Sequence, residues 1–323
     1  MTNPPDFEVT SGGAIALQPV VVARKTPSRL FWDRLRQDKV ALVGGGVILM
    51  LLFIAIFGGP IAQAITGHGP NDIVPGSQDA FGVPLGPSSN LWFGADDAGR
   101  DLFVRTMYGA RISLFVGVVA SGLAVLIGLV VGLAAGFFGG FIDTILSRTA
   151  DVLLAVPQIL IAVGIVAACY SKNGCLGGLI QPGLNVVIVV ITLFSWSYIA
   201  RIVRGYTLSL REKEFVESAR AAGASNFRIL FAEILPNLIG PLIVYTTLLI
   251  PSNILFEAAL SYLGLGVPST EPTWGNILSG ATDLYNVAWW LMLFPGLFLI
   301  LTTLAFNLLG DGLRDAFDVR TER

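Results

Sequence analysis

Long uncharged stretches alternate with short charged segments along this chain. The uncharged stretches run from Val40 to about Ile61, Ile112 to Ile142, Val152 to Ser171, Asn173 to Ala200, Ile234 to Phe256 and Leu284 to Gly310. Each of them holds the ~20 residues that a helix needs to cross ~30 Å of hydrocarbon. The pattern therefore predicts an all-α, polytopic membrane protein with six transmembrane helices.

Composition agrees with a membrane protein and narrows the chemistry. Of 323 residues, 54% are hydrophobic and 13% are charged, whereas an average globular chain carries about 25% charged residues. The net charge of -2 gives no overall basic field, so we expect the lipid bilayer and no nucleic acid as a partner. A single histidine, His68, and two cysteines leave too few ligands for an intrinsic metal centre, so we expect no metal site.

The distribution of basic residues predicts which side of the membrane each loop occupies. Sixteen of the 20 lysines and arginines lie before the first stretch, between the second and third, between the fourth and fifth, or after the sixth. The positive-inside rule then places both termini in the cytoplasm. We expect a cytoplasmic tail over residues 1–39, with the first ~28 disordered, a transmembrane domain over 40–310 and a second cytoplasmic tail over 311–323. A cleaved secretory signal is the competing interpretation, but the first apolar run exceeds the ~7–15 residues of such a signal.

Two segments are then expected outside the cytoplasm. Residues from about 64 to 108 are rich in Gly, Pro, Asn and Asp, which favours an irregular excursion with turns. Arg100 and Asp101 within it either form a local helix cap and salt bridge or contact an external protein. The second segment holds Cys169 and Cys175, which either pair as a disulfide or remain free thiols, and the sequence leaves both open.

The second stretch carries small residues at every fourth position. They are Ala120, Ala124, Gly128, Gly132, Gly136 and Gly140. A row of this kind lets another helix backbone approach closely, whereas glycine without such a role costs a helix interior ~1 kcal/mol per site. We interpret the row as a helix-packing seam, whose partner helix belongs to this chain or to another subunit.

The cytoplasmic segment over about 208–236 predicts two short helices joined by a glycine corner. Good helix formers from Glu214 to Ala222 end at Gly223, and Ser225 or Asn226 can cap a second helix. Phe215 and Val216 offer apolar anchors, which favours insertion of the first helix into a groove of a soluble protein. The alternative is a helix lying flat on the lipid surface, which four glutamates in the segment disfavour.

These motifs resemble a known family. Glu217-Ser-Ala219, Gly223 and Ile234-Leu-Pro236 resemble the EAA loop of bacterial ABC importer permeases, although Ser218 replaces an alanine and Glu233 an apolar residue or histidine. More narrowly, the chain resembles the C-type permease of the dipeptide/oligopeptide/nickel importer family. Further segments that carry this resemblance are 94–101, 108–114, 257–266, 272–276, 294–296 and 305–315.

The resemblance implies a type I ABC importer permease in the bacterial cytoplasmic (inner) membrane. Such a subunit forms half of a translocation path for di- or oligopeptides, beside a sister permease, two ABC ATPase subunits and an extracytoplasmic peptide-binding protein. It is not an enzyme and binds no cofactor, because ATP and Mg²⁺ bind to the partner ATPases; the chain has no G-x-x-x-x-G-K-[ST] loop. The resemblance assigns ATPase coupling to Phe215, Glu217, Ala219, Arg220, Ala222 and Gly223.

Glu257 is an ionisable residue within a predicted span. A carboxylate costs ~2.5–3.5 kcal/mol at mid-bilayer, so Glu257 is expected either in the translocation path or in a buried hydrogen-bonding anchor, with Ser261 as its neighbour. Trp274, Trp289 and Trp290 are expected as interfacial anchors.

Other cargoes and other classes of membrane protein compete with the interpretation as a peptide importer subunit. Within the same family the cargo is a peptide, a glutathione-like solute or a nickel chelate. A secondary transporter usually has repeated halves with broken helices, and no such repeat is present in the sequence. A membrane hydrolase is disfavoured because H-E-x-x-H is absent and the sole histidine lies in a loop.

Overall fold

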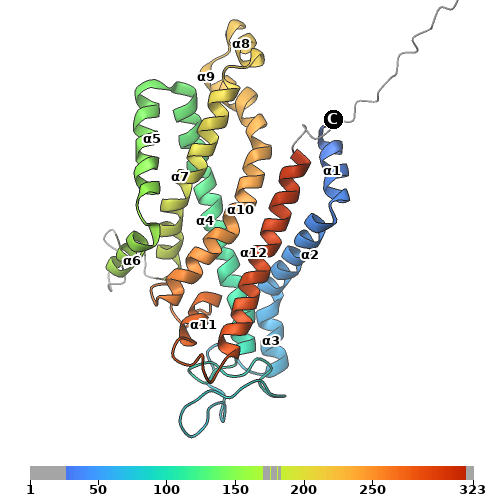
Figure 1. The fold of residues 1–323 in the computed structure, drawn as a ribbon, viewed down its shortest axis with the longest axis vertical. Coiled ribbons are helices and arrows are strands. Elements are labelled where there is room, and N and C mark those ends of the chain that lie inside the picture. The colour runs from blue at the N-terminus through green and yellow to red at the C-terminus, as the bar shows by residue number, and fades with distance from the viewer. Residues whose placement is uncertain (1–26, 170–174, 176–179, 181–182, 318–323) are drawn as a thin grey trace, which may run out of the picture.

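The computed structural model describes residues 27–169, 175, 180 and 183–317. The predicted disorder of the first ~28 residues falls almost entirely outside this set. The helices form an elongated bundle (Figure 1). They are α1 (Pro27–Gln37), α2 (Lys39–Phe53), η1 (Ile54–Gly58), α3 (Gly59–Thr66), α4 (Leu102–Phe138), α5 (Gly140–Ala155), α6 (Gln158–Cys169), α7 (Leu184–Leu210), α8 (Glu214–Ala221), α9 (Asn226–Arg228), η3 (Ile229–Ile234), α10 (Leu235–Tyr262), α11 (Trp274–Gly280) and α12 (Trp290–Phe317).

Among the described residues, five continuous helical segments are long and apolar enough to cross a membrane. They are Lys39–Thr66, Leu102–Phe138, Leu184–Leu210, Asn226–Tyr262 and Trp290–Phe317. The third predicted span differs from expectation, because α5 and α6 meet at a bend of 89° instead of forming one straight helix. Pro157 explains the break: it has no N–H to donate, and it disfavours the helical region for Val156, which is extended at φ -89° and ψ 140°.

The small-residue row of α4 packs against α7 of the same chain. Gly128, Gly132 and Gly136 are buried in this contact. A Cβ added to Gly132 would lie 2.6 Å from both the carbonyl oxygen of Ala200 and Cβ of Val203. The predicted seam is therefore confirmed and its partner is α7; Gly140, the last member of the row, lies beyond the end of α4.

Opposite ends of the bundle carry different structure. Helix α8 lies at one end, in the same half of the bundle as α1 and the end of α12, while residues 67–101 and α11 lie at the other end (Figure 1). Residues 67–101 form turns and isolated bridges, as predicted. Helix α4 begins at Leu102, where Asp101 caps it by accepting from the backbone N–H of Phe103 at 2.9 Å.

A buried ion cluster fastens the 67–101 segment to the bundle. The Asp96 carboxylate lies 2.7 Å from Nε of Arg100 and 3.0 Å from Nε of Arg105. Burial raises the pKa of Asp96, and the two guanidinium groups act in the opposite direction. Arg105 also donates to the carbonyl oxygens of Pro70 and Ser269, each at 2.9 Å. The local cap and salt bridge expected for Asp101 and Arg100 are thus confirmed.

Two of the three tryptophans expected at the interface are instead buried. Trp274 is 0% exposed and donates its indole N–H to the carbonyl oxygen of Thr106 at 3.1 Å. Trp290 is likewise buried and donates its indole N–H to the carbonyl oxygen of Ala95 at 3.0 Å. Only Trp289 keeps an exposed ring among them. The interfacial role is therefore wrong for Trp274 and Trp290, because their indole N–H groups have backbone partners inside the protein.

Candidate functional site

The projecting segment between α7 and α10 folds as a helix, a glycine corner and a second helix. Helix α8 ends at Ala221, and Gly223 adopts a left-handed φ of +82°. The Ala224 N–H donates to the carbonyl oxygen of Ala219 at 3.0 Å, which closes the helix end. Ser225 then caps α9 by accepting from the Arg228 N–H at 3.3 Å. Of the two caps that the sequence allowed, the structure uses Ser225.

The inner face of α8 joins this segment to the bundle. Val216 is 0% exposed and packs in a cluster with Ile229 and Ile234 of η3 and with Ala150 of α5. This position corrects the expectation that Val216 is an outward-facing anchor. Because η3 runs directly into α10, α8 is held against the beginning of a membrane-spanning segment.

The opposite face of α8 is open to solvent. Among the residues predicted to couple to an ATPase, Phe215, Glu217, Arg220, Ala222 and Gly223 are exposed, and Ala219 is half-buried against the bundle. No atom of the described residues lies within 4 Å of a Cβ added to Gly223. The glycine corner is thus accessible and carries little side-chain bulk, while the inner face of α8 is packed against the bundle.

Phe227 is a further exposed aromatic residue that sequence reasoning missed. Its side chain is 70% exposed, against 39% for Phe215, and its ring centroid lies 4.4 Å from that of Phe231. A large apolar residue just after the glycine corner, in a segment with four glutamates, was the available signal. Two exposed aromatic rings on a projection are typical of a protein contact surface.

Glu257 and Ser261 lie together in the interior, between α10, α4 and α11. The hydroxyl of Ser261 donates to the Glu257 carboxylate at 2.7 Å, and that of Ser113 donates at 3.2 Å. Ser113 in turn accepts from the backbone N–H of Trp274 at 3.2 Å. Glu257 is 0% exposed, and within the described part of the chain no lysine or arginine pairs with it. This geometry is that of a hydrogen-bonding anchor; a role in the translocation path stays a prediction.

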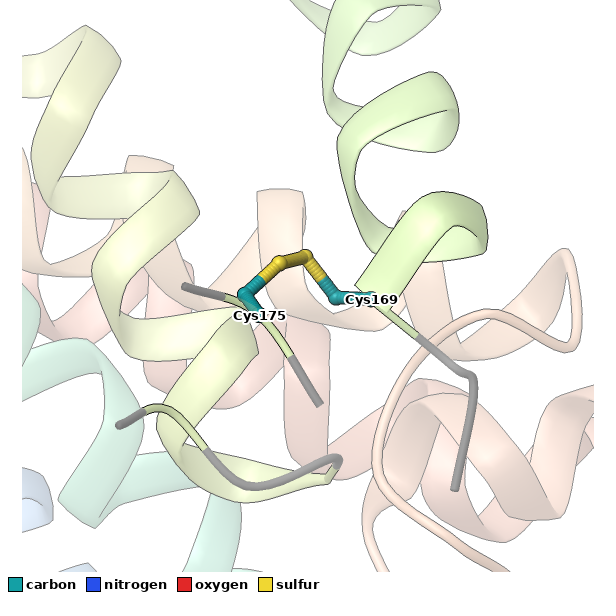
Figure 2. The surroundings of a disulfide bond; sticks show 2 residues. All are labelled: Cys169 and Cys175. Carbon is teal, nitrogen blue, oxygen red and sulfur yellow. A yellow bond between two sulfur atoms is a disulfide. The ribbon is translucent and has the colours of Figure 1, made fainter. Parts of the chain in front are cut away.

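The two cysteines form a disulfide. Cys169 at the end of α6 is bonded to Cys175 (Figure 2). Cys175 also exchanges backbone hydrogen bonds with Ile180, at 3.0 and 3.3 Å. Of the two possibilities that the sequence left open, the structure has the pair, and it has no free cysteine.

Comparison with known proteins agrees with this arrangement. Residues 128–323 match the family described as binding-protein-dependent transport system inner membrane component, and residues 26–82 match the N-terminal TM domain of oligopeptide transport permease C. The dipeptide transport system permease protein DppC of Bacillus subtilis is 39% identical over 293 residues, which are 90% of this chain and 85% of that protein. The glutathione transport system permease protein GsiD of Salmonella typhimurium is 44% identical over 294 residues, 91% of each chain.

The fold is also found in a solved transporter. An inward-facing structure of the MetNI methionine ABC transporter aligns with a TM-score of 0.52 and 22% identity, covering 64% of this chain and 94% of that one. The family match and the helical bundle together identify a multi-pass permease of the ABC importer class. The chain belongs to the family of binding-protein-dependent transport system inner membrane components. Its role is that of a non-catalytic membrane subunit, which works with an ATPase and other subunits.

Proposed function

We propose that this chain is the permease subunit through which a peptide importer couples ATP hydrolysis to passage of di- or oligopeptides. The peptide cargo is supported by the relatives named as dipeptide and oligopeptide permeases, which are 39% and 38% identical to this chain. The observation that carries the coupling role is α8, whose inner residue Val216 is 0% exposed while Phe215 remains 39% exposed. A helix fixed on one face and open on the other suits transmission of force from a docked partner.

In this mechanism an ATPase subunit binds the exposed face of α8 in a groove. Movement of that subunit displaces α8, and Val216 passes the displacement to η3 and so to α10. Interdigitated cores shift as packed units and do not deform continuously. The close α4–α7 contact supports the idea that these two helices move together.

The same proposal includes a sister permease, two ATPase subunits and an extracytoplasmic peptide-binding protein. It places both termini and α8 in the cytoplasm, with residues 67–101 outside. The positive-inside distribution supports this orientation, since the segment around α8 alone carries six basic residues from Arg201 to Arg228. Glutathione, named for the Salmonella relative, is itself a short peptide, and the ligand that co-purifies with the cognate binding protein will identify the cargo.

Replacement of Gly223 tests the coupling role. Gly223→Asn keeps a residue type that tolerates left-handed φ, whereas Gly223→Asp has nearly the same shape and adds a negative charge. Burying that charge against a partner is unfavourable. In proteoliposomes with the complete importer, we expect Gly223→Asp to lower ATP-driven peptide uptake at least tenfold, with Gly223→Asn near wild type.

The control is the amount of permease in the membrane, measured by quantitative immunoblotting, together with co-purification of the ATPase. Glu217→Lys is a second variant, expected to lower uptake while leaving insertion unchanged. Equal uptake by the Asn and Asp variants, or a parallel loss of membrane insertion, contradicts the docking role.

A further inference from the structure

A cavity of about 560 Å³ lies where α5, α6, α7, α10 and α12 meet. Its polar lining residues include Gln158, Ser195, Tyr198, Tyr245, Asn253 and Asn307. Within the described chain, none of its lining residues is charged. The volume falls in the range of about 300–1,000 Å³ that is usual for sites of small ligands.

A hydrogen-bond network holds one amide in the cavity wall. Asn253 is 3% exposed; its Oδ1 accepts from the Ser195 hydroxyl at 2.8 Å and its Nδ2 donates to the Ser121 hydroxyl at 2.9 Å. A buried amide is unfavourable unless it is hydrogen-bonded, so these contacts fix Asn253 between α4, α7 and α10. An amide has two acceptor sites and two donor hydrogens. One acceptor site and one donor hydrogen of the Asn253 amide are therefore left for a further partner.

The break between α5 and α6 borders the same cavity. Leu154 and Gln158, on either side of the 89° bend, both line it. Non-helical backbone at membrane depth is tolerated only where it is buried in protein or lines a water-filled cavity. A break at this place therefore favours a hydrated cavity. A helix that faced only lipid would have no need of a break like the one between α5 and α6.

We propose that this cavity binds the peptide bonds of the cargo during translocation, through side-chain amides and hydroxyls. The inference rests on the proposed function and specifies where and how cargo is contacted. A peptide bond has one N–H and one C=O, which Asn253 and Gln158 can match. The rings of Tyr198 and Tyr245, with centroids 6.3 Å apart, form an apolar wall that accepts varied side chains. Because no lining residue is charged, the cavity favours no particular charge on the cargo.

Cysteine protection tests the proposal directly. The chain has two cysteines, both in the disulfide, so Ser252→Cys supplies the only free thiol of the permease. Ser252 lines the cavity and is exposed; within the part of the chain that the structure describes, its hydroxyl donates only to the Leu248 carbonyl oxygen of its own helix. In the complete importer with its binding protein, we expect dialanine and trialanine to slow labelling by N-ethylmaleimide at least fivefold during ATP turnover. Ser209→Cys, on α7 and outside this cavity, is the matched control and is expected to label at an unchanged rate.

A second pair of variants tests the amide chemistry. Gln158→Leu keeps the approximate size and removes the amide, whereas Leu154→Met alters the same wall without removing a polar group. At equal amounts of permease in the membrane, we expect uptake to fall at least fivefold in the first and less than twofold in the second.

The proposal is overturned if Ser252→Cys labels equally with and without peptide while uptake continues, or if its thiol is unreactive throughout the transport cycle. Equal uptake by Gln158→Leu and Leu154→Met also overturns it. By contrast, absence of ATP-driven peptide uptake in the wild-type complex contradicts the proposed function itself, so the two failures are distinguishable.

Discussion

At the scale of single residues, the interior of this protein depends on polar groups that satisfy one another. Glu257 accepts from two serine hydroxyls, and one of these, Ser113, accepts in turn from the backbone of α11. The carboxyl group thereby links α4, α10 and α11. Removing one member of such a network leaves buried groups without partners, which costs about 1–3 kcal/mol each.

Two substitutions of Glu257 separate hydrogen bonding from packing. Gln can keep both hydroxyl contacts, whereas Leu keeps the approximate volume and removes them. We expect Glu257→Leu to lower the free energy of unfolding by about 1–3 kcal/mol per orphaned group, with Glu257→Gln close to wild type. Thermal unfolding of the purified importer measures the difference. Identical midpoints for the two variants would show that the hydroxyl contacts contribute nothing.

At the scale of elements, α4 and α7 approach each other closely along the small-residue row. This approach requires residues without a side chain because the carbonyl oxygens of α7 lie against the row: an added Cβ on Gly136 would lie 2.9 Å from that of Arg204. Gly122 lies on the same helix outside the row, and an added Cβ there has nothing within 4 Å.

Gly132 in the row and Gly122 outside it form a matched pair of substitution sites. Gly132→Ala forces the helices apart or strains them, at a cost of about 1–3 kcal/mol for overpacking. Gly122→Ala is expected to gain about 0.5–1 kcal/mol from helix propensity. The melting temperatures of the two purified variants should thus move in opposite directions. A gain in both would mean that the row does not set the helix separation.

At the scale of the whole molecule, the proposed orientation places the disulfide and α8 on opposite sides of the membrane. The Cys169–Cys175 bond is consistent with an oxidising compartment, while α8 belongs with the ATPase in the cytoplasm under the proposed function. The orientation of the bundle is therefore testable with the native cysteines and one cysteine introduced on α8.

In right-side-out vesicles, we expect membrane-impermeant phosphine reduction to make both cysteines reactive toward an impermeant maleimide. Without reductant, no labelling of the permease is expected, because the two thiols are bonded to each other. Glu217→Cys on the exposed face of α8 should label only in inside-out vesicles. Labelling of the native pair exclusively in inside-out vesicles contradicts the proposed orientation.

The sequence by itself determined the membrane class, the approximate spans and the glycine corner after α8. Uncharged runs of sufficient length have few alternatives to a spanning helix, because the bilayer leaves no other way to satisfy the backbone. Gly223 marked the corner because only a residue without Cβ adopts its left-handed φ at little cost. Pro157 also indicated a break in the third span, but the uncharged stretch around it continues without interruption and predicted one straight helix.

Only the tertiary structure decided which groups meet. It selected α7 as the partner of the small-residue row, turned Val216 inward, buried Trp274, and joined Asn253 to Ser195 and Ser121. Hydrophobic periodicity reports that a residue is apolar, but in a membrane protein lipid and protein interior are equally apolar. The face that a helix turns toward its neighbours is therefore set by close packing and hydrogen-bond geometry, which arise only when the helices come together.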